Sequence, residues 1–352
     1  MTVRGRVTLT DVAGQAGVST TTASYILNGR SGQMRISPIT QERVRKVARE
    51  LGYRPNRSAR SLRTARTATI GVISDFVASG HFANQMLSGA SAAAREAGHL
   101  LLIGETEGNA DVRAKLIEEM VDRQVEGILY ARVSTSAVSV PAGLLQHRVV
   151  LLNCVDPALP VPAVVPDEQG GGRAAAELLV RNGVPGAIYV VGQDPTPGAL
   201  AGAQRLEGVE AALARRGRRV AGVVACDWDV EPAYDAVSAW LAQGHRPGAL
   251  VCLNDRVAMG TYNALAEHGL RVPQDVSVVS FDGSELAGWL RPRLSTVGLP
   301  YTEMGELAVR LLLDPARGGG RHLFQVPMAL TEGASVRAVV GDSTVDGGGR
   351  CL

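Results

Sequence analysis

The chain has 352 residues, of which 45% are hydrophobic and 20% are charged, and its net charge at pH 7 is +2. This length predicts two or three domains. No apolar run approaches the roughly 20 residues that span a bilayer, and the amino-terminal stretch MTVRGRVTLTDVAG contains no apolar segment typical of a signal peptide. The composition thus excludes a membrane protein, and we expect a cytoplasmic protein without a membrane partner.

Charge is distributed unevenly along the chain. Residues 1–66 contain 13 Arg or Lys against three acids, a net charge of +10, which leaves −8 for residues 67–352. A small basic head on a larger acidic body is the electrostatic footprint of a nucleic-acid binder.

The stretch LTDVAGQAGVSTTTASYIL, residues 9–27, predicts two short helices joined by a tight turn. Thr10 and Asp11 are residue types that cap a helix, Gly17 can adopt the positive φ of a turn, and Ser19 can cap the second helix. Apolar residues recur at helical spacing in both segments, namely Val12, Ala16, Ala23, Ile26 and Leu27. In a strongly basic context this pattern indicates a helix-turn-helix.

A third helix is predicted over SPITQERVRKVARELGY, residues 37–53. Ser37 is its expected cap, Pro38 suits the first helical position, and Gly52 suits its end. The next segment, YRPNRSARSLRTART, begins with a break at Pro55. It has too little apolar surface to fold alone, so residues 56–64 are expected to become helical only when pressed against phosphates.

The remainder alternates between strand and helix patterns. The apolar runs of buried-strand type are TIGVIS, HLLLIG, EGILYA, RVVLLN, AIYVVG, VAGVVA, GALVCL and VSVVSF. Helical patterns lie between them, as in residues 82–98, 109–124 and 255–269. This alternation predicts an α/β fold with parallel sheets wrapped by helices. Two lobes are expected, with the chain crossing near residue 166 and over residues 286–300, and a ligand would bind at the carboxyl ends of the strands.

No arrangement of catalytic residues is visible. The chain has no P-loop, GxSxG or HExxH motif, and its six histidines are dispersed. Asp167 and the glycines after it are interpreted as a helix start. Four cysteines without metal-ligand spacing (Cys154, Cys226, Cys252 and Cys351) are expected to be reduced thiols, mostly buried. We therefore predict a sensor rather than an enzyme, without catalytic residues, cofactor, metal or disulfide.

The segments VTLTDVAGQAGVSTTTASYILN and LGYRPNRSARSL, followed by the α/β region, resemble the lactose-repressor (LacI/GalR) family of bacterial transcription regulators. The resemblance continues from residue 69 to about residue 313. It implies a helix-turn-helix head over residues 1–54 and a hinge helix or linker over 55–66. It also implies a two-lobed effector-binding and dimerisation domain like a periplasmic binding protein over 67–340, followed by a flexible tail over 341–352.

The resemblance also implies which residues contact DNA. Thr20 and Thr21 match the positions that choose bases, and Leu62 matches a leucine that wedges into a base step of the minor groove. Tyr25 stands where many members have arginine. The implied DNA-binding residues are Thr8, Ser19, Thr20, Thr21, Thr22, Ser24, Tyr25, Asn28, Asn56, Arg57, Ala59, Arg60 and Leu62.

The implied effector-binding residues are His81, Phe82, Arg205, Trp228, Asn254 and Asp282. A carboxylate, a guanidinium, an amide and apolar platforms suit a polyol. Three of them have a structural alternative: Phe82 could belong to the core, and Asn254 and Asp282 could cap turns. The chain departs from the family at Asp75, Gly283 and Glu332.

We therefore predict a ligand-responsive repressor that acts as a homodimer, or as a tetramer, on a near-palindromic double-stranded DNA operator. A small carbohydrate effector would relieve its DNA binding. On DNA the protein would be associated with the nucleoid. Two alternatives stay open: a regulator that uses a nucleobase or another corepressor, and a solute-binding or enzyme domain of the same fold without a DNA function.

Overall fold

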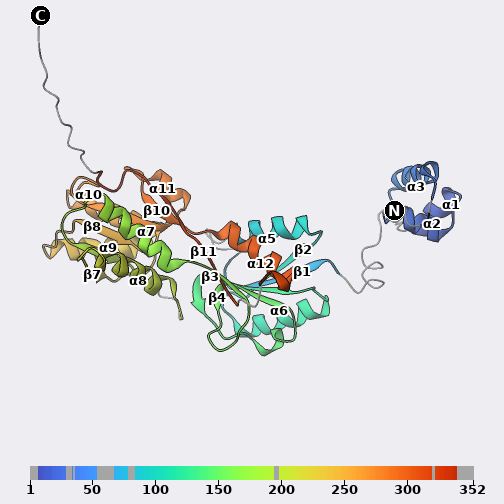
Figure 1. Ribbon diagram of the computed structural model, residues 1–352, viewed down its shortest axis with the longest axis horizontal. Coiled ribbons are helices and arrows are strands. Elements are labelled where there is room, and N and C mark those ends of the chain that lie inside the picture. The colour runs from blue at the N-terminus through green and yellow to red at the C-terminus, as the bar shows by residue number, and fades with distance from the viewer. Residues whose placement is uncertain are drawn as a thin grey trace, which may run out of the picture. The chain divides into compact units, whose positions relative to one another are not determined.

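The computed structural model describes residues 7–28, 34, 36–53, 67–77, 84–193, 198–318 and 322–338. The chain divides into two compact units, Met1–Thr67 and Ala68–Leu352 (Figure 1). No helix in these described residues is long and apolar enough to cross a membrane.

The first unit contains the three predicted helices, α1 (Leu9–Gln15), α2 (Thr20–Leu27) and α3 (Pro38–Glu50). Their apolar faces meet in one small core around Val12, Ile26 and Val44, all of which are buried. Ser37 caps α3 by accepting from Thr40 N at 3.3 Å, and Pro38 occupies the first turn. The periodicity, the caps and the core therefore agree with one another over the whole unit.

Within the second unit, the first lobe is built on a six-stranded parallel sheet in the order β11-β5-β4-β3-β1-β2. Its strands are β1 (Thr69–Ser74), β2 (Leu100–Glu105), β3 (Ile128–Ala137), β4 (Val149–Val155), β5 (Ala163–Pro166) and β11 (Leu323–Val326). Helices α5 (Asn84–Glu96) and α12 (Tyr301–Leu313) cover one face, and α6 (Ala110–Asp122) covers the other (Figure 1). Two short 3₁₀ turns, η2 (Ala142–Leu144) and η3 (Pro315–Gly318), complete this lobe.

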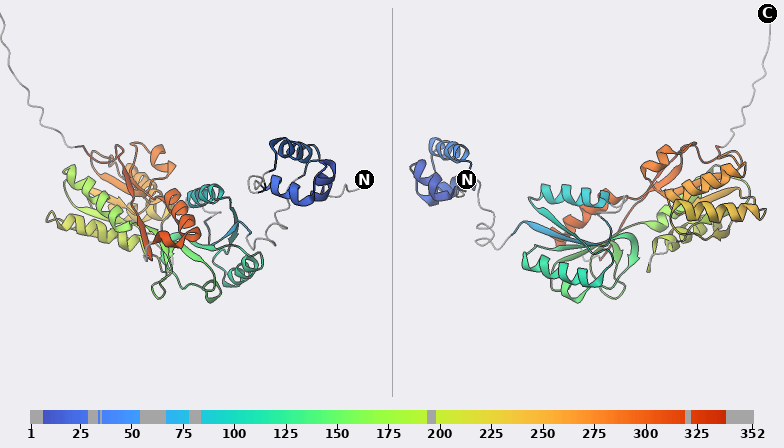
Figure 2. Two further views of the ribbon diagram at one scale, coloured as in Figure 1. Left: turned by 45° about the vertical axis from the view of Figure 1, so that its right-hand side comes forward. Right: turned by 180° about the vertical axis from the view of Figure 1, so that it is seen from behind.

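The second lobe is built on a sheet in the order β12-β10-β9-β8-β6-β7, parallel except for β12. Its strands are β6 (Ile188–Val191), β7 (Val220–Val224), β8 (Ala249–Cys252), β9 (Ser277–Asp282), β10 (Ser295–Gly298) and β12 (Ala329–Thr331). Its helices are α7 (Glu168–Arg181), α8 (Ala201–Ala214), α9 (Val230–Ala242), α10 (Asp255–Glu267) and α11 (Glu285–Trp289). Helices α7 and α8 share one core, and α9 and α10 share another. Figure 2 shows the two lobes as separate layered bodies.

In the part of the chain that the structure describes, the chain passes between the lobes three times: after β5, after β10, and between β11 and β12. The predicted crossing over 286–300 was too broad, because α11 and β10 still belong to the second lobe and the chain leaves it only after Gly298. The third crossing was not predicted. Strands β5, β10, β11 and β12 have only three or four residues each and are interrupted by polar residues or, in β5, end at Pro166, so they produce no continuous apolar run.

Candidate functional sites

The joint between α1 and α2 has the geometry of a tight turn. Gly17 has φ +63°, a conformation that suits glycine because it has no Cβ. Val18 N donates to Ala13 O at 3.0 Å, and the Ser19 hydroxyl caps α2 by accepting from Thr22 N at 3.1 Å. The two helices and their turn form the predicted helix-turn-helix.

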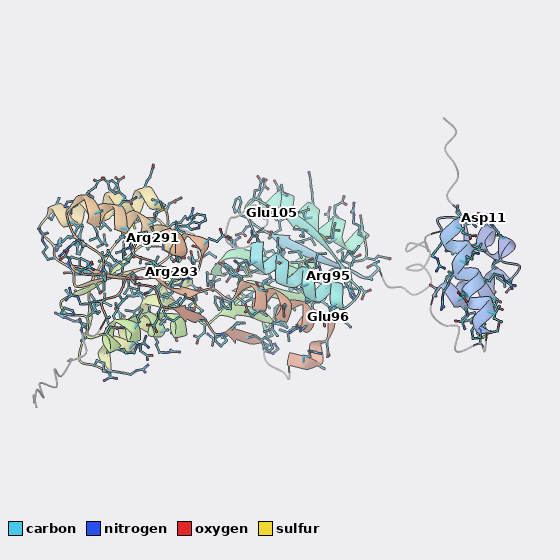
Figure 3. The ribbon with its side chains drawn as sticks, turned by 90° about the horizontal axis from the view of Figure 1, so that it is seen from above. Asp11, Arg95, Glu96, Glu105, Arg291 and Arg293 are labelled. Carbon is cyan, nitrogen blue, oxygen red and sulfur yellow. The ribbon has the colours of Figure 1, made fainter. Side chains whose placement is uncertain are left out.

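The cap of α1 differs from the prediction. Thr8 is the cap residue, not Thr10 or Asp11, because the helix begins at Leu9. Asp11 lies in the first turn, where its carboxylate accepts from Thr8 N at 2.8 Å and from the Thr8 hydroxyl at 2.7 Å. This reciprocal capping box occupies the Thr8 side chain within its own helix and lowers the pKa of Asp11. Asp11 lies on α1 (Figure 3).

The predicted DNA-facing residues of α2 fall into two groups. Thr20 and Thr21 are exposed and Tyr25 is half-buried. The others are engaged within the helix: the Ser19 hydroxyl lies 2.9 Å from that of Thr22, and Asn28 donates to Ser24 O at 2.8 Å. Thr20, Thr21 and Tyr25 are thus the side chains best placed to contact a partner.

Ser19→Ala is expected to destabilise the head by about 1 kcal/mol, because the cap of α2 is lost. Thr21→Ala is the matched control, since Thr21 is exposed on the same helix and caps nothing. Chemical denaturation would measure the free energy of unfolding of the head in both variants. Equal stability of the two variants would contradict the capping role.

Two groups of predicted residues lie outside the described residues. Asn56, Arg57, Ala59, Arg60 and Leu62 belong to residues 54–66, and His81 and Phe82 to residues 78–83. Their predicted roles therefore stay predictions.

A cleft of about 490 Å³ lies between the two lobes of the second unit. The first lobe and the crossings contribute Val133, Ser134, Thr135, Leu299 and Tyr301. The second lobe contributes Glu168, Ala201, Arg205, Asp227, Trp228, Asp229, Pro232, Asn254, Arg256 and Asp282. The cleft thus brings together four of the six predicted effector-binding residues, from α8 and from the carboxyl ends of β7, β8 and β9.

Arg205 lines the floor of the cleft and is only 1% exposed. Its Nε donates to Glu168 Oε2 at 2.7 Å and its Nη2 to Glu168 Oε1 at 3.4 Å, while Nη1 donates to Leu253 O. Glu168 is fully buried. Most of the guanidinium donors are therefore satisfied inside the protein, and the pair places little net charge on the floor.

Glycines bring Glu168 and Arg205 together. A Cβ on Gly172 would lie 2.1 Å from Arg205 O, and a Cβ on Gly208 would lie 2.1 Å from Gln169 O. Helices α7 and α8 can therefore approach so closely only without side chains at these positions. The glycine-rich start of α7 serves helix packing, as well as the helix start that Asp167 provides by accepting from Gly170 N at 2.8 Å.

Asp282 lies at the end of β9 with φ +105°, and its carboxylate is 3.8 Å from Arg205 Nη1. Burial raises the pKa of Asp282 to about 8, an effect that Arg205 opposes and that Asp255 and Glu168 reinforce. Asp255 is fully buried and accepts from Ser280, Ser284 and Thr296. Near neutral pH the Asp282 carboxyl can therefore donate as well as accept a hydrogen bond.

The raised pKa of Asp282 predicts a pH dependence of stability. Between the ordinary value of 3.8 and about 8, the folded chain holds a proton at Asp282 that the unfolded chain has lost, so this contribution falls as the pH rises through that window. Asp282→Asn should flatten the decline, as measured by urea unfolding at several pH values. Asp229→Asn, an exposed control, should leave it unchanged; an unaltered decline in Asp282→Asn would contradict the prediction.

Trp228 and Asn254 line the same wall of the cleft. Trp228 is half-buried, and the Arg205 guanidinium carbon lies 5.3 Å from its ring centre. Asn254 caps α10 by accepting from Val257 N at 2.7 Å, and its amide donates to Trp228 O at 3.3 Å. The side-chain oxygen of Asn254 therefore caps a helix, as the structural alternative proposed. Its side-chain nitrogen holds the backbone at Trp228 in place.

Sequence reasoning missed Glu168, Thr135 and Tyr301. Asp167 and the glycines after it were interpreted as a helix start, and Glu168 between them was not considered; its place at the predicted crossing near residue 166 was the available signal. Asp75, noted as a departure, serves the first lobe by accepting from Phe76 N at 2.8 Å and from Val133 N at 2.9 Å.

Within the described residues, neither the cysteines nor the side chains that commonly bind metals form a further reactive or metal-binding site. Cys154 and Cys252 are buried and Cys226 is half-buried, and all three are free thiols. Burial raises the pKa of Cys226 to about 11 and of Cys252 to about 12, which makes the reactive thiolate scarce. Across the described residues, no group of three or more His, Cys, Asp or Glu could hold a metal ion. Cys351 lies outside them.

Comparison with known proteins gives matches over both units. Residues 8–56 match the family described as bacterial regulatory proteins, lacI family, and residues 176–336 match a periplasmic binding protein-like domain. The ribose operon repressor of Escherichia coli (strain K12) is 30% identical over 313 residues, 87% of this chain and 92% of that protein. The HTH-type transcriptional repressor PurR of Escherichia coli O139:H28 (strain E24377A / ETEC) is 32% identical, over 87% and 89%. A crystal structure of the lac repressor dimer bound to operator and an anti-inducer has a TM-score of 0.80 and 25% identity, over 95% of this chain and 100% of that chain.

Proposed function

The chain belongs to the lacI family of bacterial regulatory proteins and is a DNA-binding transcriptional repressor, not an enzyme, and from this premise we propose that a small carbohydrate bound in the cleft relieves its operator binding. The observation that carries the proposal is the cleft itself, with Arg205, Asp282, Asn254 and Trp228 on its walls.

The chemistry of these walls favours an uncharged, hydroxyl-rich ligand. The Arg205 fork is already occupied by Glu168, so it is a poor partner for a ligand carboxylate. Asp282 with its raised pKa and the remaining amide hydrogen of Asn254 suit sugar hydroxyls, which donate and accept hydrogen bonds. The half-buried Trp228 offers an apolar face to the C–H groups of a sugar ring.

The proposed mechanism links this cleft to DNA through the hinge. A homodimer would place two heads on a near-palindromic operator, and a tetramer would be a pair of such dimers. Residues 1–54 would read the major groove with α2, and residues 55–66 would enter the minor groove with Leu62 as the wedge. Effector binding would act through a difference in its affinity for two arrangements of the lobes. Such a regulator would work in the cytoplasm, associated with the nucleoid.

The alternative is a nucleobase that strengthens operator binding. This chain is also similar to the HTH-type transcriptional repressor PurR, and Trp228 could stack on a base as well as on a sugar. The same experiment separates the two.

The test has two steps. Selection of bound fragments from a random DNA pool first identifies the operator. Calorimetric titration with pentoses, hexoses, disaccharides and purines then identifies the effector, with Trp228→Phe as a variant that should weaken the binding. We expect a sugar to bind and to lower operator affinity; binding of a purine that raises operator affinity would replace this proposal with the alternative.

A further inference from the structure

The carboxyl end of β3 is hydrogen-bonded to both lobes. In the first lobe, Ser136 and Ala137 pair with Cys154 and Val155 of β4, beyond a shift in register after Ala131. On its other side, Ser136 forms an antiparallel bridge with Ala199, which precedes α8 in the second lobe. Residues 135–137 therefore connect a strand of one sheet to the segment that leads into the Arg205 helix.

Two backbone hydrogen bonds make this bridge. Ala137 N donates to Gly198 O at 2.9 Å, and Leu200 N donates to Thr135 O at 2.8 Å. They flank the Ser136–Ala199 pair on both sides, so these two residues form a non-hydrogen-bonded pair, in which side chains approach most closely. A Cβ on Gly198 would lie 3.0 Å from Ala137 O, which shows how closely the two segments meet.

Side chains add a second connection at the same point. Thr135 is only 3% exposed, and its hydroxyl lies 2.8 Å from Glu168 Oε1 in the second lobe and 2.8 Å from Asn153 Oδ1 in the first. The amide of Asn153 donates to Arg132 O and Val133 O, which fixes its oxygen as an acceptor. A hydroxyl carries one hydrogen, so Thr135 can donate either within its own lobe or across to Glu168.

Ser136 supplies an independent observation. It is fully buried, and its hydroxyl has no hydrogen-bond partner. A buried hydroxyl without a partner is unfavourable, so the bridged arrangement contains a built-in cost. A ligand with a modest preference for one arrangement could then shift the equilibrium.

The bridge lies beside the cleft. Thr135 and Glu168 line it directly, and Ala201, the residue after the bridged segment, lines it too. We propose that Thr135 and Glu168 are positioning residues of the effector response, and that residues 135–137 are a latch that fastens the first lobe to residues 198–200 of the second through their backbone. This inference rests on the proposed function, since it names how the same cleft is coupled to lobe movement.

A disulfide across the bridge tests the latch in the full-length chain. Ser136→Cys with Ala199→Cys should form one readily, because the Cα atoms of a non-hydrogen-bonded pair lie about 4.5 Å apart, within the range that a disulfide spans. Peptide mapping would measure the bond, and dithiothreitol would reverse it. Ala199→Cys alone, treated identically, is the matched control.

The decisive measurement is operator affinity with and without a mixed probe of D-ribose, D-glucose and cellobiose. We expect the probe to change the affinity of the reduced double variant at least tenfold and that of the oxidised form less than twofold. An oxidised form that responds as fully as the reduced form overturns the latch.

A second experiment, without ligand, tests the latch independently of which effector binds. Hydrogen exchange at Leu200 N should be at least tenfold faster in Thr135→Val than in the native chain, and Thr135→Ser, which keeps the hydroxyl, should restore slow exchange. If the probe leaves every form unchanged, none of these three sugars is the effector, and hydrogen exchange alone decides the latch. Equal exchange in Thr135→Val and the native chain would then overturn it.

Discussion

Arg205→Met is expected to destabilise the second unit by about 3–5 kcal/mol, because it leaves the fully buried Glu168 carboxylate without its partner. Among the described residues, Glu168 would retain only the Thr135 hydroxyl at 2.8 Å, which does not compensate a buried charge. The effector response should be lost as well, since Arg205 lines the cleft. Chemical denaturation followed by circular dichroism measures the loss of stability.

Two controls separate the buried pair from a general effect of removing an arginine. Arg181→Met breaks an ion pair with Glu332 that is more than half exposed on both sides, and it should cost less than about 1 kcal/mol. Adding Glu168→Gln to Arg205→Met removes the stranded charge and should recover part of the lost stability. A cost for Arg205→Met as small as that for Arg181→Met would show that the pair does not hold the two helices together.

Leu62→Ala is expected to weaken operator binding at least tenfold while effector binding in the cleft stays unchanged. The reason is the proposed wedge: an apolar side chain inserted into a base step lets bent DNA contact more protein, and alanine is too short to hold the step open. Gel-shift titration against the selected operator measures the change, and calorimetry checks the effector.

Arg60→Ala is the matched control for Leu62→Ala. It should weaken binding to specific and non-specific DNA alike and reduce the dependence of affinity on salt by about one phosphate contact. Leu62→Ala should instead leave the salt dependence nearly unchanged and affect mainly the specific operator. Unchanged operator affinity in Leu62→Ala would remove the wedge from the mechanism.

The head was predictable from the sequence because the information that defines it is local. Ser19 and Ser37 cap helices that begin one residue later, and Gly17 and Gly52 take the positive φ angles that their positions suggest. The one error concerned the cap of α1, which is Thr8 and not Thr10 or Asp11. The first residue of a helix is hard to predict where several polar residues lie close together, because each of them can serve as a cap.

The strands of the two lobes were predictable wherever hydrophobic runs were long. All eight predicted apolar runs coincide with strands of the two sheets. Strands β5, β10, β11 and β12 were missed, and with them the third crossing between β11 and β12. Polar residues interrupt β10, β11 and β12 and β5 ends at Pro166, whereas the equally short β6 and β8 are hydrophobic throughout and were predicted.

The sequence by itself therefore determined a basic helix-turn-helix head, an α/β body and the repressor family, because capping, periodicity and charge are properties of neighbouring residues. Only the tertiary structure decided that Glu168 pairs with Arg205, 37 residues away, and that Thr135 reaches Glu168 across the lobes. These contacts depend on how closely α7 and α8 pack at Gly172 and Gly208 and on where β3 ends. Neither is specified by any short stretch of the chain, because each is fixed by the packing of elements that are distant in sequence.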